Sequence, residues 1–181
     1  MSAPQIDSGL GGISVADLDN SHLVPTRKSD ADQVQFDQVA LFQWLSRVGG
    51  ECETLEHLLK GSSEVICCQT DCIGLWVTQK SEDGSFSQIY SILDNQTHVD
   101  WNSFQVLGRR MIKLAASSNQ IQATKIPNSD NLQLVVVPVI EGKQVNTMIA
   151  GCFRLSVIEH SQNEWLMGIF AQSVSNWLGQ K

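Results

Sequence analysis

Apolar residues recur with a helical period in two segments near the start of the chain. In residues 30–50 they fall on one helical face, and the pair Gly49-Gly50 ends the run. Residues 52–69 repeat the pattern with a second apolar face. The apolar positions of the first face are Val34, Leu41, Leu45 and Val48. Two amphipathic helices are therefore expected before residue 70.

Between residues 72 and 157 the apolar period changes to that of extended chain, with turn residues between the runs. The strands that this pattern predicts are residues 72–79, 86–93, 121–126, 132–140 and 145–157. Two further helices are predicted at residues 100–117 and 161–179. Pro138 lies inside one of the predicted strands, so we expect an edge position or a bulge there.

Strands that come mainly as hairpins favour an antiparallel sheet with helices packed against it, which is an α+β fold. Residues 1–30 are rich in Gly, Ser, Asp and Asn and have no sustained periodicity, so we expect a flexible leader. Residues 31–181 then form a single domain. The hydrophobic fraction of 42% and the charged fraction of 17% are ordinary for a globular domain with a sizeable core.

The net charge of −7 argues against some classes of partner. An acidic surface repels phosphate backbones, so nucleic acid is not expected as a direct partner. The sequence has no polybasic cluster for anionic lipid, no signal-peptide pattern, and no apolar run near the roughly 18 residues of a membrane span. We therefore expect a cytoplasmic protein without direct membrane contact. The odd number of cysteines, 5, agrees with a reducing compartment.

Three stretches of sequence combine elements in a distinctive way. "LEHLLKGSSEVICCQTDCIGLWVTQ" (55–79) runs from a helix through a short turn into a strand of alternating apolar residues. "LVVVPVIEGKQVNTMIAGCFR" (134–154) is an apolar strand with a proline near its end, a turn with glycine and a long strand. "WLMGIFAQSVSNWL" (165–178) is a closing helix. In these features residues 32–179 resemble a GAF domain.

The resemblance implies a central antiparallel sheet of about five to six strands, with the N- and C-terminal helices on one face and a middle helix and loops on the other. GAF domains are typically sensory modules that bind a small molecule or dimerise, and that pass a signal through their end helices. The chain is then expected to be a non-catalytic regulatory domain, the N-terminal part of a larger signalling or transport protein. A pure protein–protein interaction scaffold is an alternative.

A pocket over the sheet, walled by the middle helix and its flanking loops, also follows from the resemblance. The expected lining residues are Tyr90, His98, Asp100, Trp101 and Arg109. The structural alternative is that Trp101 fills the core, Asp100 caps the helix and Arg109 faces solvent. No cysteine lies between Ile73 and Gly151, which argues against a covalent bilin and against the free methionine sulfoxide reductases of this fold. No cofactor and no catalytic residue is predicted.

Cys67, Cys68 and Cys72 lie close together in the sequence. The simplest interpretation is burial: Cys68 or Cys67 packs the helix onto the sheet, and Cys72 begins an inward-alternating strand. Neighbouring helical side chains diverge by about 100°, so Cys67 and Cys68 cannot easily share an ion, and no metal site is predicted. The alternative is a cysteine-based redox enzyme or sensor that uses Cys68, Cys72 or Cys152. That alternative requires an exposed thiol with a lowered pKa.

The first and last helices carry more apolar surface than a single contact with the sheet requires. Left exposed, this surface favours aggregation, so we expect it to meet a second copy across a two-fold axis. A homodimer is therefore the predicted assembly. The predicted interface residues are Phe36, Trp44, Trp165, Ile169 and Trp177. The alternative is that the leader folds over this surface.

Overall fold

The computed structural model describes residues 43–45, 47–48, 51–93, 101–127, 129, 131–155 and 160–180, without the side chains of 68–69, 101–104 and 160–161. Its helices are α2 (Leu55–Gln69), α3 (Trp101–Ser118) and α4 (His160–Leu178). Its strands are β1 (Cys72–Lys80), β2 (Phe86–Leu93), β3 (Gln122–Lys125), β4 (Leu132–Glu141) and β5 (Gln144–Arg154). Residues 43–45 and 47–48 are also helical. The predicted leader, residues 1–30, lies outside the described residues.

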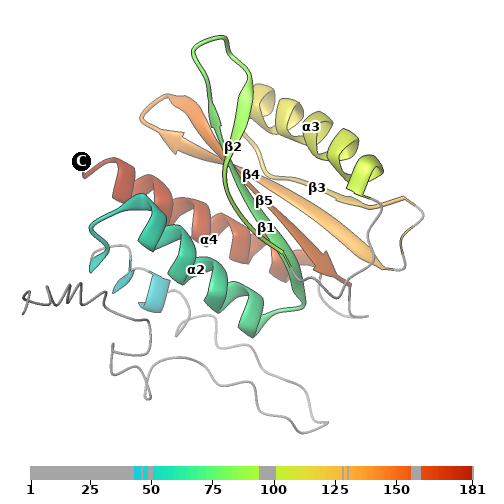
Figure 1. Ribbon diagram of the computed structural model, residues 1–181, viewed down its shortest axis with the longest axis horizontal. Coiled ribbons are helices and arrows are strands. Elements are labelled where there is room, and N and C mark those ends of the chain that lie inside the picture. The colour runs from blue at the N-terminus through green and yellow to red at the C-terminus, as the bar shows by residue number, and fades with distance from the viewer. Residues whose placement is uncertain are drawn as a thin grey trace, which may run out of the picture.

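The strands form one antiparallel sheet in the order β2-β1-β5-β4-β3. α2 and α4 lie side by side on one face of this sheet, and α3 lies on the other (Figure 1). This arrangement confirms the predicted α+β fold with end helices on one face and a middle helix on the other. The order of the elements also agrees with the hydrophobic pattern from residue 55 onward.

Alternation along the central strands divides the interior into two layers. Leu75 and Val77 of β1 contribute to the layer under α2 and α4, which we call the α2/α4 core. Ile73 contributes to the layer under α3, which we call the α3 core. Large side chains of the α2/α4 core include Leu58, Ile66, Phe153, Leu166 and Phe170. The α3 core includes Met111, Ala115, Leu134, Met148 and Cys152.

Threonines bound α2 at both ends. The Thr54 hydroxyl accepts a hydrogen bond from the His57 N–H at 3.2 Å, which satisfies one of the open donors of the first turn. At the other end Thr70 has extended backbone angles, and its N–H still donates to the Ile66 carbonyl at 3.0 Å. The chain enters β1 only two residues later. The connection between α2 and β1 is therefore short and hydrogen-bonded.

Pro138 lies in β4, which has neighbours on both sides in the strand order. However, β3 pairs only with residues 133–136 of β4, so Pro138 lies beyond the end of that pairing. A register shift then follows between Val139 and Ile140. The proline therefore occupies a part of the strand where the ladder is incomplete on one side, next to a bulge, as expected from its missing N–H.

Gly151 of β5 permits close packing of α4 on the sheet. A Cβ at this position would lie 2.6 Å from Cε2 of Phe153 and 2.9 Å from Sδ of Met167. Both neighbours are fully buried, so neither can move without disturbing the α2/α4 core. Gly108 of α3 is the opposite case, because nothing lies within 4 Å of a Cβ built there.

Gly151→Ala is expected to lower the free energy of unfolding by about 1–3 kcal/mol, because an added methyl group in a close-packed core displaces its neighbours. Gly108→Ala is the matched control. It is expected to raise the free energy of unfolding by up to about 1 kcal/mol, because alanine favours a helix interior. Urea unfolding followed by circular dichroism measures both changes. Equal effects of the two substitutions would contradict the close approach of α4 to β5.

Candidate functional site

The α3-facing side of β1 and β2 is the part of the sheet where the predicted pocket belongs. α3 makes its main contacts with β3, β4 and β5, away from these two strands. Alternation along β1 from Gly74 to Thr78 and the register with β2 assign six residues to the α3-facing side, and we call them the β1–β2 floor. These residues are Gly74, Trp76, Thr78, Gln88, Ser91 and Leu93. The pair Lys80 and Phe86 continues this side toward the turn between the two strands.

Trp76 supplies the aromatic surface of the β1–β2 floor. A Cβ on Gly74 would lie 2.9 Å from Cη2 of Trp76 and 2.9 Å from Cδ2 of Leu93. The indole is half-buried and packs against the edge of the α3 core. Gly74 therefore allows the ring to lie close against the strand, where any side chain would displace it.

Thr78 adds a buried polar group to the same surface. Its side chain is 9% exposed and its Oγ1 has no hydrogen-bond partner. The nearby Gln88 is already engaged, since its Nε2 donates to Ser91 Oγ at 3.1 Å. Leaving a buried hydroxyl unsatisfied costs about 1–3 kcal/mol, so such groups are uncommon in native proteins. The Thr78 hydroxyl is therefore a buried polar group that the described chain leaves unpaired.

Tyr90 is not part of the β1–β2 floor, and the prediction that it lines a pocket under the middle helix is wrong. Its ring packs against the α2/α4 core on the opposite face of the sheet. The cause is a β-bulge: Thr78 pairs with Gln88, but Val77 pairs with Tyr90, so Ile89 is an extra residue. From Tyr90 to Leu93, each β2 side chain therefore lies on the opposite face of the sheet from the one it would occupy in a hairpin without a bulge.

Arg109 is the one other predicted lining residue whose side chain the structure describes. It is exposed on α3, as the structural alternative expected. Trp101 begins α3, but its side chain lies outside the described residues, as do His98 and Asp100. Sequence reasoning missed Trp76 and Thr78. Both residues flank Val77 in the predicted strand, so alternation places them together on the face opposite to Val77, and this pattern could have identified them.

Tyr90 instead faces α2 and a cluster of polar side chains there. Burial is the main cause that raises the pKa of its hydroxyl, while a hydrogen bond with Ser63 acts in the opposite direction. The negative charges of Glu64 and Glu56 and the nearby Cys67 raise the pKa further. The Ser63 hydroxyl also donates to the Leu59 carbonyl within α2. Tyr90 therefore connects the edge strand β2 to α2.

Two of the three candidate residues of the cysteine-enzyme alternative lack the properties of a nucleophilic thiol. Cys72 is 8% exposed, and a hydrogen bond with Cys67 and burial raise its pKa well above the ordinary value. Cys152 is 1% exposed in the α3 core, and burial raises its pKa to about 12. A nucleophilic thiol needs a lowered pKa and access to substrate. The side chain of the third candidate, Cys68, lies outside the described residues.

Trp44, one residue of the predicted dimer interface, is buried within the single chain. Its side chain is 3% exposed and belongs to the α2/α4 core of the single chain. Val48, of the same helical residues 43–45 and 47–48, lies against α2, since a Cβ on Gly61 would be in ordinary van der Waals contact with Cγ1 of Val48, at 3.8 Å. Trp44 is therefore not available to a second copy, and its indole belongs to the core.

The three α4 residues of the predicted interface are half-buried. Trp165, Ile169 and Trp177 pack against the edge of the α2/α4 core. The Trp177 Nε1–H also donates to the Cys52 carbonyl at 2.8 Å. Phe36 lies outside the described residues. Their role between two copies stays a prediction.

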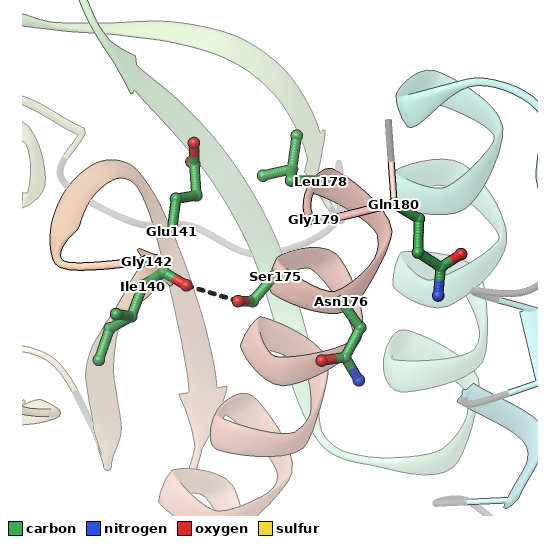
Figure 2. A pocket seen from close by; sticks show the side chains of 8 residues that line it. All are labelled: Ile140, Glu141, Gly142, Ser175, Asn176, Leu178, Gly179 and Gln180. Carbon is green, nitrogen blue, oxygen red and sulfur yellow. Dashed lines mark hydrogen bonds between the residues drawn. The ribbon is translucent and has the colours of Figure 1, made fainter.

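A hollow of about 490 Å³ lies between the end of α4 and the turn that joins β4 to β5. Figure 2 shows the Ser175 hydroxyl donating to the Ile140 carbonyl across it, at 2.5 Å, while Glu141 extends away from Ser175. The Glu141 carboxylate already accepts hydrogen bonds from Thr147 at 3.1 Å and Asn146 at 3.5 Å. None of the predicted site residues lines this hollow, and we do not assign a ligand to it.

The fold is similar to that of GAF domains of known structure. The GAF domain of a phosphoenolpyruvate-protein phosphotransferase (ptsP) from Coxiella burnetii is 10% identical, with a TM-score of 0.59 over 78% of this chain and 92% of that chain. The GAF domain of the potassium sensor histidine kinase KdpD from Escherichia coli is 10% identical, with a TM-score of 0.54 over 78% and 93%. The fRMsr of Staphylococcus aureus, in complex with substrate, is 9% identical, with a TM-score of 0.57 over 79% and 96%.

The chain therefore has a GAF-like fold, the fold of a domain found in a sensor histidine kinase and in a phosphotransferase. At these identities the likeness shows the fold alone, and an enzyme shares it. No family model and no curated protein matches the sequence. Among the helices that the structure describes, none combines the length and the hydropathy needed to cross a membrane.

The buried Cys152 thiol predicts a loss of stability at alkaline pH. Its pKa is raised from the ordinary 9.0 to about 12, so the folded chain keeps a proton that the unfolded chain loses. This contribution to stability is fully present below pH 9.0 and decreases as the pH rises toward about 12. By about pH 11 the loss amounts to roughly 3 kcal/mol.

Cys152→Ala removes this titration, so its free energy of unfolding should decrease less steeply above pH 9.0 than that of the unaltered chain. Chemical unfolding at a series of pH values measures the difference in slope, which is independent of any constant offset from the lost side chain. Cys52→Ala is the comparison: burial and the charge of Glu51 also raise the pKa of this half-buried thiol, but its loss should change the slope less than the loss of Cys152. Parallel curves for Cys152→Ala and the unaltered chain would show that Cys152 is not a buried neutral thiol.

Proposed function

We propose that the chain is a non-catalytic sensory or regulatory domain that binds a small molecule against the β1–β2 floor. The observation that carries this proposal is a half-buried indole, Trp76, beside a buried hydroxyl without a partner, Thr78, on one face of one strand. Ligand sites combine apolar and aromatic walls with a few oriented polar groups. The GAF domain of a potassium sensor kinase supports the sensory role by analogy of fold.

The chemistry of the floor favours an uncharged ligand with a flat apolar part. None of its six residues carries a charge, and Lys80, the next α3-facing position, is exposed at the end of β1. Trp76 offers a large aromatic surface for stacking, and the Thr78 hydroxyl offers one donor and two acceptor sites. An ionic group placed against these residues would lose hydration without gaining a partner, which is costly.

We also propose that the domain acts in the cytoplasm as a homodimer within a larger signalling or transport protein. The half-buried apolar residues of α4, Trp165, Ile169 and Trp177, leave part of their surface for a second copy. A ligand that binds one arrangement of sheet and helices better than another shifts the population toward that arrangement. The end helices would transmit this shift to the rest of the protein.

A protein-interaction scaffold is the second candidate. It is favoured by two large apolar side chains on α3 that remain in solvent, Val106 at 71% exposed and Leu114 at 44%. They are eight positions apart and therefore lie on the same side of the helix. A scaffold of this kind needs no small molecule, so a search for ligands separates the two candidates.

Thr78→Val and Thr147→Val distinguish a ligand-binding hydroxyl from a structural one. Without ligand, Thr78→Val is expected to keep or raise the melting temperature, because the lost hydroxyl bonds nothing. Thr147→Val is expected to destabilise by about 1–3 kcal/mol, because the Thr147 hydroxyl donates to Glu141 at 3.1 Å. A set of uncharged metabolites is then tested for compounds that raise the melting temperature of each protein.

A true ligand of the floor raises the melting temperature of the unaltered chain and of Thr147→Val, but not that of Thr78→Val or Trp76→Leu. A shift that survives both floor substitutions would contradict the proposed site. No shift with any compound would favour the scaffold.

The oligomeric proposal is tested by sedimentation at roughly 50 µM, where a dimer is expected. Ile169→Glu places a charge within the proposed α4 interface and should give a monomer. Gln172→Glu adds the same charge at an exposed position of α4 and is the control. A monomeric unaltered chain, or a dimer that Ile169→Glu leaves intact, would contradict the proposed interface.

A further inference from the structure

The turn between α2 and β1 brings two cysteines together. Cys67 lies in the last turn of α2, and Cys72 is the first residue of β1. The Cys67 side chain packs against the α2/α4 core, to which Cys72 belongs. The two thiols are in direct hydrogen-bonding contact, although the helix ends between them. Both side chains are thiols, not halves of a disulfide.

Thr70 holds this turn in place with both its backbone and its side chain. Its N–H donates to the Ile66 carbonyl at 3.0 Å, and its hydroxyl donates to the same carbonyl at 2.7 Å. The hydroxyl oxygen also accepts from the Cys72 N–H at 3.2 Å. The start of β1 is therefore fixed to the end of α2 at the position where the two thiols meet.

The turn is also tied to the centre of the sheet. The Asp71 carbonyl accepts a hydrogen bond from the Arg154 N–H of β5 at 2.8 Å. The Cys72 thiol donates to the Gly74 carbonyl at 3.4 Å, which orients its sulfur within the core. Because both sides of the turn are anchored, the backbone positions of Cys67 and Cys72 are fixed relative to each other.

The two sulfurs differ in access, which suits a two-step oxidation. Cys67 is half-buried and is the more accessible of the two residues. Cys72 is 8% exposed and lies inward of it. Contact with Cys67 and burial hold the pKa of Cys72 high, so this thiol keeps its proton in the resting state. The accessible sulfur reacts first, and the buried sulfur is already in position for the second step.

We propose that Cys67 and Cys72 are a modification site that closes to an intramolecular disulfide on exposure to a peroxide. The Cys67 sulfur attacks one peroxide oxygen and becomes a sulfenic acid, and the other oxygen leaves as water. The Cys72 sulfur then attacks the sulfenic sulfur, and the Cys72 proton leaves with the sulfenic hydroxyl as a second water. Two thiols lose two electrons in total and one peroxide gains them. A thiol reductant reverses the reaction.

The other cysteines are placed differently. Cys152 belongs to the α3 core, on the opposite side of the sheet from Cys72. Cys52 precedes the start of α2 and lies at the far end of that helix from Cys67. Cys68 is the sequence neighbour of Cys67 and is therefore the essential control.

The disulfide would join α2 to the sheet beside Tyr90, whose hydroxyl is close enough to Cys67 to be influenced by it. Because α2 contacts α4, closing this bond would restrict the helix layer. This site lies on the face opposite to the β1–β2 floor and does not depend on the proposed ligand.

The test treats the full chain with hydrogen peroxide, blocks remaining thiols with an alkylating reagent and measures the intact mass. The expected product takes up two fewer alkyl groups and is about 2 Da lighter than the reduced chain before alkylation. Cleavage before Asp71 separates Cys67 from Cys72, so the two peptides stay joined only through the disulfide. Reduction with dithiothreitol restores both thiols.

Cys67→Ser and Cys72→Ala should each abolish the intramolecular product, whereas Cys68→Ser should form it at the unaltered rate. Circular dichroism verifies that each variant is folded. In Cys72→Ala the sulfenic acid at Cys67 should accumulate and react with a dimedone probe, a readout that remains if Cys67→Ser does not fold. The proposal is overturned if Cys68→Ser abolishes the product, if Cys67→Ser retains it, or if the unaltered chain yields only disulfides between chains.

Discussion

Alternation of side chains along β1 is the constraint on which both halves of the molecule depend. β1 lies between β2 and β5, so each of its residues must belong to one face of the sheet or the other. Leu75 and Val77 are fully buried under α2 and α4, while Trp76 and Thr78 lie toward α3. A shift of one residue in register would exchange these sets and place a threonine hydroxyl in the α2/α4 core. Gly151 and Gly74 support the arrangement, since each permits a large side chain to approach the sheet on one face.

The two faces that this alternation creates have different properties. The α2/α4 face is closely packed and carries Tyr90, the Cys67–Cys72 pair and the half-buried residues of α4. The polar groups and thiols of this face lie between the helices and the sheet. The α3 face has a smaller core, and over β1 and β2 it offers an indole and an unsatisfied hydroxyl. The proposed ligand site and the proposed dimer interface therefore lie on opposite sides of one sheet, and the strand β1 connects them.

Hydrophobic periodicity predicted the elements well, because each face of the sheet is buried and each helix has one apolar side. It failed where a local irregularity decides which face a residue occupies. The bulge at Ile89 reverses the orientation of Tyr90, and no residue in "FSQIYSIL" signals it. Trp44 was predicted at an interface because its helix has surplus apolar surface, but the surface of α2 around Gly61 accommodates that helix. The proximity of Cys67 and Cys72 depends on how Thr70 ends α2, which spacing alone does not reveal.

The division of the sheet into two faces is tested most directly by the indole N–H signals of the chain, which contains 5 tryptophans. These signals are recorded by nitrogen-labelled NMR and assigned by single substitutions, during titration with a compound that raises the melting temperature. The account predicts that the Trp76 signal moves most and that the Trp44 signal, from a residue 3% exposed on the other face, stays in place. A large movement of Trp44 with an unchanged Trp76 would contradict it.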